Sequence, residues 1–318
     1  MRKFLHELLV ISACVISAIL VMFIFGVFFI GSQYENDYNA SLLDKSARLK
    51  AINTPKIILV GNSNLSFGMD SNMLENVMNM PVVNLGLHGG LGNAFHENIA
   101  KLNINSGDII IVCHSTYSDD SRITDITLCW VTLEYHKDLW EILRPEDYPY
   151  MVMAFPKYWF NSLKHLITRA ISSQDADNVS AYRRRSFNKY GDVVIKPDIN
   201  KPENEIFWPG REKLPEINDI CVSRLNELNQ YAKERGADLL VAGYPISHGI
   251  YSPPDEGYVK FQKELEEKLD CEIISDFRDY FMPYSCFYDF TLHLNEEGTR
   301  RRTEQLIRDI KKWQAGRK

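Results

Sequence analysis

The feature that most constrains this chain is an apolar run near its N-terminus, from Leu8 to Ile30, in which no residue carries a charge. A helix rises about 1.5 Å per residue, so the run would extend roughly 34 Å and cross a hydrocarbon core of about 30 Å. A cleaved signal peptide usually has a shorter apolar region followed by small residues. This run ends in bulky residues, Val27 to Ile30, so a retained membrane anchor is the better interpretation.

The flanks of the run predict its orientation. Arg2 and Lys3 precede it, whereas Glu35 and Asp37 are the first charged residues after it. The positive-inside rule then places the N-terminus in the cytoplasm. No second run of comparable length follows. We therefore expect a single-pass plasma-membrane protein, with residues 1–31 as cytoplasmic tip and anchor and the main domain periplasmic or extracellular.

The remaining composition is that of a globular protein. Of 318 residues, 45% are hydrophobic and 25% are charged, which excludes collagen-like and disordered classes. The net charge of -6 argues against a nucleic-acid partner, because duplex-binding proteins present a basic face. The cysteines form no CxxC pair, so we expect no zinc site or other metal site. A disulfide between Cys271 and Cys286 and buried free thiols both remain open.

Short β-branched runs alternate with amphipathic helical patterns through much of the chain. The expected strands are residues 56–60, 82–84, 108–113, 238–242 and 272–274. This alternation is typical of βαβ units, which form a parallel sheet covered by helices on both faces. We expect one α/β domain over residues 55–318.

Two segments depart from the alternation. Residues 32–54 are polar and are expected to form a stalk containing one short helix. Residues of about 115–215 are rich in aromatic side chains and are expected to form a helical insertion. Ligands of open α/β sheets bind beyond the carboxyl ends of the strands, and we expect the insertion to lie above that edge.

Three short motifs follow expected strands. The first is Gly61-Asn62-Ser63-Asn64, between the first strand and a helix. A serine in such a turn lies near a helix N-terminus, where negative charge is stabilised, and it is a candidate nucleophile. An ordinary helix-capping serine is the alternative.

The second motif covers residues 84–92 and contains four glycines within seven residues. Glycines let backbone amides approach an oxyanion closely, although a tight turn alone would also explain them. A dinucleotide-binding fingerprint is disfavoured because the motif follows the second strand rather than the first.

The third motif places Asp289 and His293 on a loop just before the last expected helix. An imidazole so placed can act as general base for a serine, and a nearby carboxylate can fix its tautomer. The alternative is that Asn295 caps the helix and that His293 has no chemical role.

The order of these motifs resembles that of the SGNH/GDSL hydrolase family, in particular its membrane-anchored bacterial branch. The resemblance covers about residues 56–114 and 217–314. It implies a flavodoxin-like three-layer αβα fold and ester hydrolysis or acyl transfer without metal or organic cofactor. It also implies Ser63 as nucleophile, His293 as base and Asp289 as the orienting carboxylate. The backbone amides of Ser63 and Gly89 would form the oxyanion hole.

Two departures from the family pattern matter. The spacing between Asp289 and His293 is four residues, where the family usually has three. The block after the third strand, residues 112–118, lacks the family's oxyanion-hole asparagine. Ser115 or Tyr117 is the alternative donor, and losing one such donor typically lowers the rate about 10²–10³-fold.

Four further side chains are candidates for lining the pocket. They are Asn62, His88, His114 and His248. For His88 and His114 a structural role is the stronger expectation. His248 follows the fourth expected strand and ranks below His293 as a candidate base.

These observations predict a membrane-tethered, exported serine esterase or acyltransferase. By analogy with the anchored branch of the family, its substrate would be O-acyl groups, chiefly acetyl, of a cell-surface glycan. Its partners would be a multi-spanning acyltransferase or glycan-assembly proteins. Two alternatives remain: a weakly active or inactive component of a surface-polymer assembly system, and a lipid-active esterase.

Overall fold

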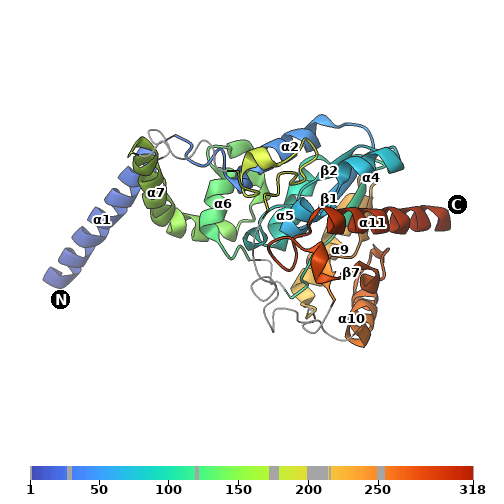
Figure 1. Cartoon of the computed structure of the whole chain (residues 1–318). Helices are drawn as coiled ribbons and strands as arrows, with labels where there is room; N and C mark the ends of the chain where they lie inside the picture. Colours follow the sequence, from blue (N-terminus) through green and yellow to red (C-terminus); the bar gives the residue numbers. More distant parts are fainter. Residues whose placement is uncertain are drawn as a thin grey trace.

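The computed structural model describes residues 2–26, 31–118, 122–171, 179–198, 214, 216–248 and 255–317. Five strands within them form a parallel sheet in the order β2-β1-β3-β4-β6 (Figure 1). The strands are β1 (Ile57–Val60), β2 (Val82–Asn84), β3 (Ile109–Val112), β4 (Asp238–Val241) and β6 (Glu272–Ile273). The parallel sheet predicted from the alternating pattern is therefore confirmed, strand by strand.

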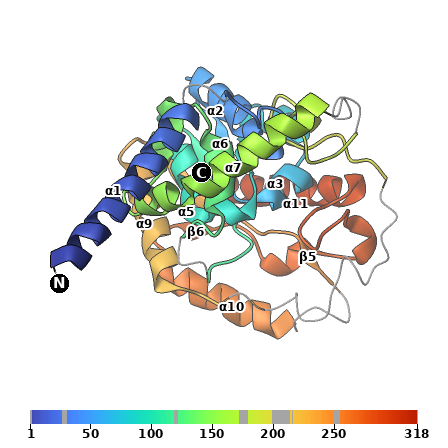
Figure 2. The same cartoon turned by 90° about the vertical axis from the view of Figure 1, so that its left-hand side faces the viewer.

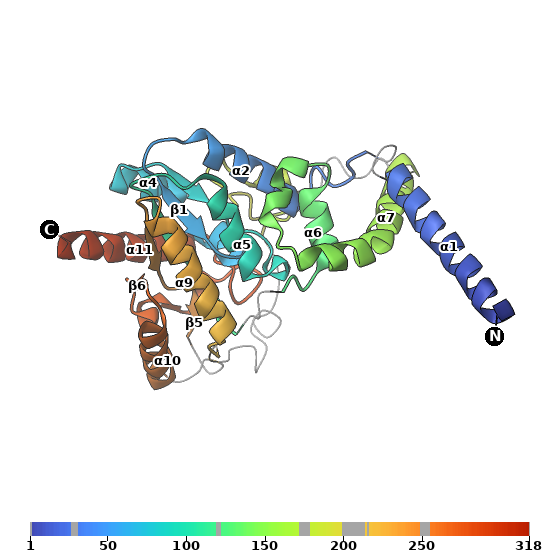
Figure 3. The same cartoon turned by 180° about the vertical axis from the view of Figure 1, so that it is seen from behind.

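Helices cover both faces of this sheet (Figures 1 and 3). One face packs against α2 (Ser41–Ala51), α5 (Asn93–Ala100), α9 (Asp219–Lys233) and α10 (Asp255–Lys268). The other face packs against α3 (Ser63–Gly68), α4 (Ser71–Met78) and α11 (Glu296–Gly316). Successive residues of a strand point to opposite faces, so Ile58 joins the first core and Leu59 the second. All four residues of β1 are buried, as expected for a sheet covered on both sides.

Shorter elements complete the domain. β5 (Ile246–Ser247) pairs with β7 (Phe281–Met282) in a separate two-stranded sheet that the sequence did not predict. The 3-10 helices of the described segments are η2 (Tyr38–Ala40), η3 (Gly89–Leu91), η4 (Lys101–Asn103), η5 (Lys137–Ile142), η6 (Arg184–Ser186), η7 (Phe277–Tyr280) and η8 (Tyr284–Cys286). Cys271 and Cys286 are both free thiols, so the disulfide between them that the sequence left open is not formed.

In its described residues, the aromatic-rich insertion contains the α-helices α6 (Ile126–Leu133) and α7 (Asp147–Ile171). Trp130 of α6 packs its ring against Phe155 and Tyr158 of α7, with centroids 5.2 and 5.4 Å apart. Core packing thus accounts for several of its aromatic residues. Much of the later insertion, residues 199–213, lies outside the described residues.

The apolar run forms most of α1 (Arg2–Phe25), which projects from the body (Figures 1 and 2). Within the described residues, α1 is the one helix long and apolar enough to cross a membrane, and none of its residues is buried. The last part of the expected anchor, residues 27–30, lies outside the described residues.

The expectation that residues 32–54 form a stalk outside the domain is wrong. Leu42 and Leu49 of α2 are fully buried against the sheet. The chain just after the span is also fixed, because the Glu134 carboxylate accepts hydrogen bonds from the Ser32 hydroxyl and the Gln33 backbone amide. This segment is therefore part of the α/β domain, and several of its polar residues, among them Asn39, Lys45 and Ser46, are buried in it.

Candidate active site

The Ser63 turn lies where β1 ends and α3 begins. Asn62 caps α3, since its side-chain oxygen accepts a hydrogen bond from the backbone amide of Asn64 at 3.0 Å. Ser63 is the first helical residue and is half-buried. Its place at a helix N-terminus is the one expected for an oxygen that develops negative charge.

A buried arginine forms hydrogen bonds to this turn. Arg302 of α11 is fully buried, and its guanidinium donates to the backbone oxygen of Asn64 at 2.6 Å and to the Asn64 side-chain oxygen at 2.8 Å. Burial lowers the pKa of Arg302. Asn64 in turn donates from its side chain to the carbonyl of Cys113, at the end of β3. The Ser63 turn is therefore fixed to two separate parts of the fold.

The structure brings together the three side chains that the sequence singled out. His293 Nε2 lies 2.9 Å from the Ser63 hydroxyl oxygen, and His293 Nδ1 lies 2.7 Å from a carboxylate oxygen of Asp289. The Asp289 and His293 side chains are 9% and 7% exposed, which leaves little water to compete for these contacts. The four-residue spacing between them allows direct contact, because the 290–292 loop folds back between β7 and α11.

The His293 ring is also fixed by packing. The ring of Phe67, from α3, stacks on it with centroids 4.0 Å apart and planes within 8°. Asn295 caps α11, as the alternative interpretation of this motif proposed, by accepting from the Gly298 amide at 3.1 Å. Capping and the serine contact thus coexist, since they use different residues of the same loop.

Tyr182 is a site residue that the sequence did not indicate. Its hydroxyl donates to the carboxylate oxygen of Asp289 that His293 leaves free, and it lies 3.2 Å from His293 Nδ1. Burial and the contact with Asp289 raise the pKa of Tyr182, so the hydroxyl keeps its proton and donates. Tyr182 also packs against Tyr38 and Phe67. No local pattern links this tyrosine to a loop more than a hundred residues away.

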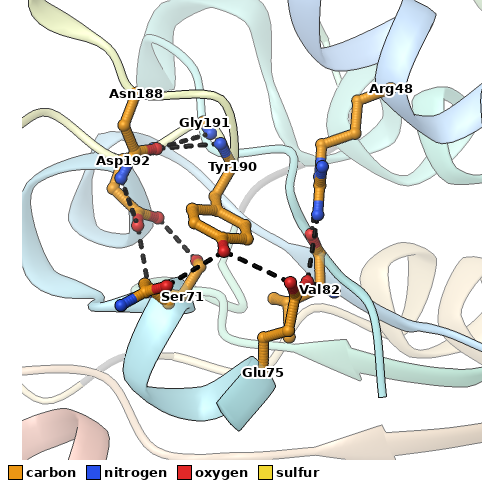
Figure 4. Close-up of polar contacts among 9 residues, drawn as sticks. Arg48, Ser71, Glu75, Val82, Asn188, Tyr190, Gly191 and Asp192 are labelled. Carbon is orange, nitrogen blue, oxygen red and sulfur yellow. Dashed lines mark hydrogen bonds and ion pairs between the residues drawn. The ribbon is translucent and has the colours of Figure 1, made fainter. Parts of the chain in front are cut away.

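A polar network holds the segment that carries Tyr182 (Figure 4). The buried carboxylate of Asp192 accepts from the Ser71 hydroxyl at 2.6 Å and from the Asn84 side chain at 2.8 Å. The Tyr190 hydroxyl donates to Glu75, which also pairs with Arg48 at 3.0 Å (Figure 4). These contacts attach residues 186–194 to α4 and to the edge of the sheet.

The expected oxyanion donors lie in different environments. Gly89 lies beside Asn62, because a Cβ placed on it would be 3.7 Å from Asn62 Cβ. Ser115 accepts a hydrogen bond from the Asn62 side chain at 2.7 Å and so contacts the same turn. Tyr117 is fully buried, and its ring packs against Phe261 in the core. Tyr117 is therefore not positioned as a donor, and of the two alternatives only Ser115 contacts the Ser63 turn.

The three other candidate histidines, His88, His114 and His248, make different contacts. His88 caps η3 by accepting from the Gly90 amide at 3.0 Å. His114 is buried and contacts Glu97 at 2.8 Å, and Glu97 also pairs with Arg224. Burial alone would raise the pKa of Glu97, but the hydrogen bond from His114 and the charge of Arg224 lower it.

His248 lies at the end of β5 and stacks on Phe281. Within the described residues, no hydrogen bond or ion pair joins His248 to Ser63, Asp289 or His293. His293 is thus the histidine placed to act on Ser63. No group of His, Cys, Asp and Glu among the described residues could hold a metal ion.

We compared the chain with protein-family models, with curated proteins and with solved structures, and none of the three comparisons found a match.

Proposed function

We infer that this protein is a serine hydrolase or acyltransferase that acts on ester bonds through Ser63. The observation that carries the proposal is the continuous contact from Ser63 through His293 to Asp289. A serine, a histidine and a carboxylate in this order recur on unrelated folds that break ester and amide bonds. The strand order β2-β1-β3-β4-β6 supports the resemblance to the SGNH/GDSL family, because it is the flavodoxin-like order 2-1-3-4-5.

The proposed reaction proceeds in two steps. Ser63 Oγ attacks the ester carbonyl while its proton passes to His293 Nε2, and Asp289 stabilises the imidazolium through Nδ1. Collapse of the tetrahedral intermediate breaks the ester C–O bond, and His293 returns the proton to the leaving alkoxide. Water or an acceptor hydroxyl then attacks the acyl-enzyme and gives its proton to His293. The acyl–Oγ bond of Ser63 breaks, and His293 returns the proton to Ser63 Oγ.

The developing oxyanion would be stabilised by the backbone amides of Ser63 and Gly89. Ser115 would act indirectly, because its hydroxyl accepts from Asn62 and so fixes the residue before the nucleophile. In the family pattern an asparagine from the third block supplies a further donor, and this chain has none there. That absence favours the second candidate, a weakly active or non-catalytic component of a surface-polymer assembly system.

The proposed location and substrate follow from the resemblance to the anchored branch of the family. Helix α1 would hold the domain at the outer face of the plasma membrane, and the substrate would be acetyl or other O-acyl groups of a cell-surface glycan. A multi-spanning acyltransferase would be the partner.

A fluorophosphonate probe tests the chemistry, because it reacts covalently with an activated serine. The full chain in detergent should be labelled, and Ser63→Ala should abolish the labelling. Ser223→Ala, on the exposed face of α9, is the matched control and should label like the wild type. Labelling that survives Ser63→Ala unchanged would refute the mechanism, and absence of labelling in the wild type would favour the non-catalytic candidate.

A further inference from the structure

Helix α7 presents an apolar stripe that nothing in the described structure covers. Met153, Phe160, Ile167 and Ile171 are 68%, 63%, 51% and 81% exposed. Their spacing of seven, seven and four residues places them on one side of the helix. The opposite side is buried against α6 through Phe155 and Tyr158. The stripe therefore faces away from the domain.

The position of α7 relates this stripe to the membrane anchor. Phe23 of α1 packs on Phe155 of α7 with ring centroids 4.7 Å apart. Gly26 allows the close approach, because a Cβ there would lie 2.5 Å from the Trp159 ring. Both contacts lie at the C-terminal end of α1, and Figures 1 and 3 show α7 beside that end. The Tyr135 hydroxyl fixes this end further by donating to the Gly26 carbonyl at 2.7 Å.

Most of α7 carries positive charge, which an anionic phospholipid surface attracts. From Tyr148 to Ile171 the helix carries Lys157, Lys164 and Arg169 and no carboxylate, although the whole chain has a net charge of -6. Lys157 and Lys164 are exposed and lie four residues after Met153 and Phe160, so they flank the stripe. Lysines in this position can extend their ammonium groups to lipid phosphates while their methylene chains stay beside apolar side chains.

We propose that α7 lies in the headgroup region of the bilayer, with Met153, Phe160, Ile167 and Ile171 inserted at the boundary with the acyl chains. A helix with one apolar face and flanking lysines binds membranes in this way, and binding strengthens with anionic lipid. The adjoining end of α1 holds α7 at the correct depth. The domain is thereby held at the membrane by two elements, which fixes its orientation. This inference does not depend on the hydrolase chemistry.

Spin labels on the full chain test the proposal, in nanodiscs containing phosphatidylcholine and phosphatidylglycerol. With Cys14 and the partly exposed Cys271 replaced by serine, labels at Phe160→Cys and Ile167→Cys should collide with oxygen, which concentrates in lipid, and be shielded from a water-soluble nickel chelate. Ile11→Cys on α1 provides the lipid reference, and Val259→Cys on α10, also exposed, provides the water reference. The α7 labels should match the lipid reference more closely than the water reference.

Three results would overturn the proposal. Labels at 160 and 167 that match Val259→Cys would place the stripe in water. Labels shielded from both oxygen and nickel would show that protein, such as a second copy of this chain, covers the stripe. A water-exposed reading at Ile11→Cys would also overturn it, because α1 would not span the bilayer.

Charge reversal tests the role of the lysines separately. Each of Lys157→Glu and Lys164→Glu should lower the ratio of docked to undocked α7 by at least about fivefold, since a lysine near an anionic surface is worth about 1 kcal/mol. Lys260→Glu, on exposed α10, is the matched control and should leave the α7 labels unchanged. An equal response to all three substitutions would contradict the lysine contribution.

Discussion

Tyr182 donates a hydrogen bond to one carboxylate oxygen of Asp289 while His293 holds the other. The carboxylate is thus fixed from two sides, by a residue of the insertion and by a residue of the loop before α11. Orientation of a catalytic base commonly depends on such outer contacts, which lock a side chain in one rotamer. On the proposed function, Tyr182 is a positioning residue for the base.

Tyr182→Phe removes this hydrogen bond and leaves the ring packing in place. A hydrogen bond to a charged group contributes about 1.5–3 kcal/mol, so we expect turnover of an acetyl ester to fall roughly 10–100-fold. The Michaelis constant should change little, because Tyr182 contacts the base rather than the nucleophile. Steady-state kinetics of Tyr182→Phe beside Tyr150→Phe, an exposed control on α7, measure the effect. Wild-type turnover in Tyr182→Phe would show that the contact has no catalytic role.

Asp289→Asn should have a larger effect. The asparagine amide would donate to His293 Nδ1 and leave Nε2 protonated, so that Nε2 could not accept the Ser63 proton. We expect turnover to fall on the order of 10⁴-fold with the fold retained. Rapid-quench fluorophosphonate labelling measures the loss as a labelling rate. Asp279→Asn, which changes an exposed carboxylate of η7, is the control, and equal labelling rates in the two variants would contradict the prediction.

Arg302→Lys tests how much the hydrogen bonds of Arg302 to the Ser63 turn stabilise the fold. Lysine cannot reproduce the two-pronged contact with the backbone and side-chain oxygens of Asn64. We expect the free energy of unfolding to fall by about 1.5–3 kcal/mol, because buried acceptors lose a charged donor. Urea unfolding of the full chain in detergent, followed by tryptophan fluorescence, gives the value. Arg301→Lys changes an exposed neighbour and should cost less than about 0.5 kcal/mol, and a similar cost for both would refute the prediction.

Lys45 gives the domain a stability that rises with pH. Its ammonium is fully buried against the carbonyls of Asn84 and Gly191, and burial lowers its pKa from 10.5 to about 7. Below pH 7 both the folded and the unfolded states hold the proton. Between pH 7 and 10.5 only the unfolded state holds it, so raising the pH through this range stabilises the folded state.

Urea unfolding of the full chain at several pH values between 6 and 8.5, below the range in which most unfolded thiols ionise, should therefore show an increasing free energy of unfolding. Lys45→Met should reduce the slope, with Lys50→Met, an exposed neighbour on α2, as the control. Some slope should remain above pH 8, because burial also lowers the pKa of Lys196 to about 8. An unchanged slope in Lys45→Met would exclude Lys45 as the source.

The sequence predicted the sheet well because its central strands β1 and β3 are buried on both faces. Ile57–Val60 and Ile109–Val112 are continuous apolar runs, and a run of that kind has few alternatives to a central parallel strand. The two-residue strands β5 and β7 are too short to produce a pattern. The error over residues 32–54 has a different cause. Lys45 reads as a surface residue, yet its aliphatic chain and ammonium are buried beside Gly191.

The candidate site was likewise predicted only in part. Ser63, Asp289 and His293 were identified because each follows a strand or precedes a helix, and the carboxyl edge of the sheet brings such positions together. Tyr182 reaches this edge through contacts made by residues 186–194 to α4 and β2. Contacts between segments so distant in sequence leave no periodicity, so the sequence could not indicate them.

The short connection between α1 and Tyr38 limits where the protein can act. Tyr38 follows Phe25 by thirteen residues, which can extend at most about 45 Å. Tyr38 stacks on Phe67, and Phe67 stacks on His293, so the tether ends beside the nucleophile. On the proposed function, and with α1 in the bilayer, chemistry at Ser63 would be confined to a thin layer above the lipid. Polymer farther out in the envelope would then be beyond reach, and the proposed substrate would have to be modified while it is still close to the membrane.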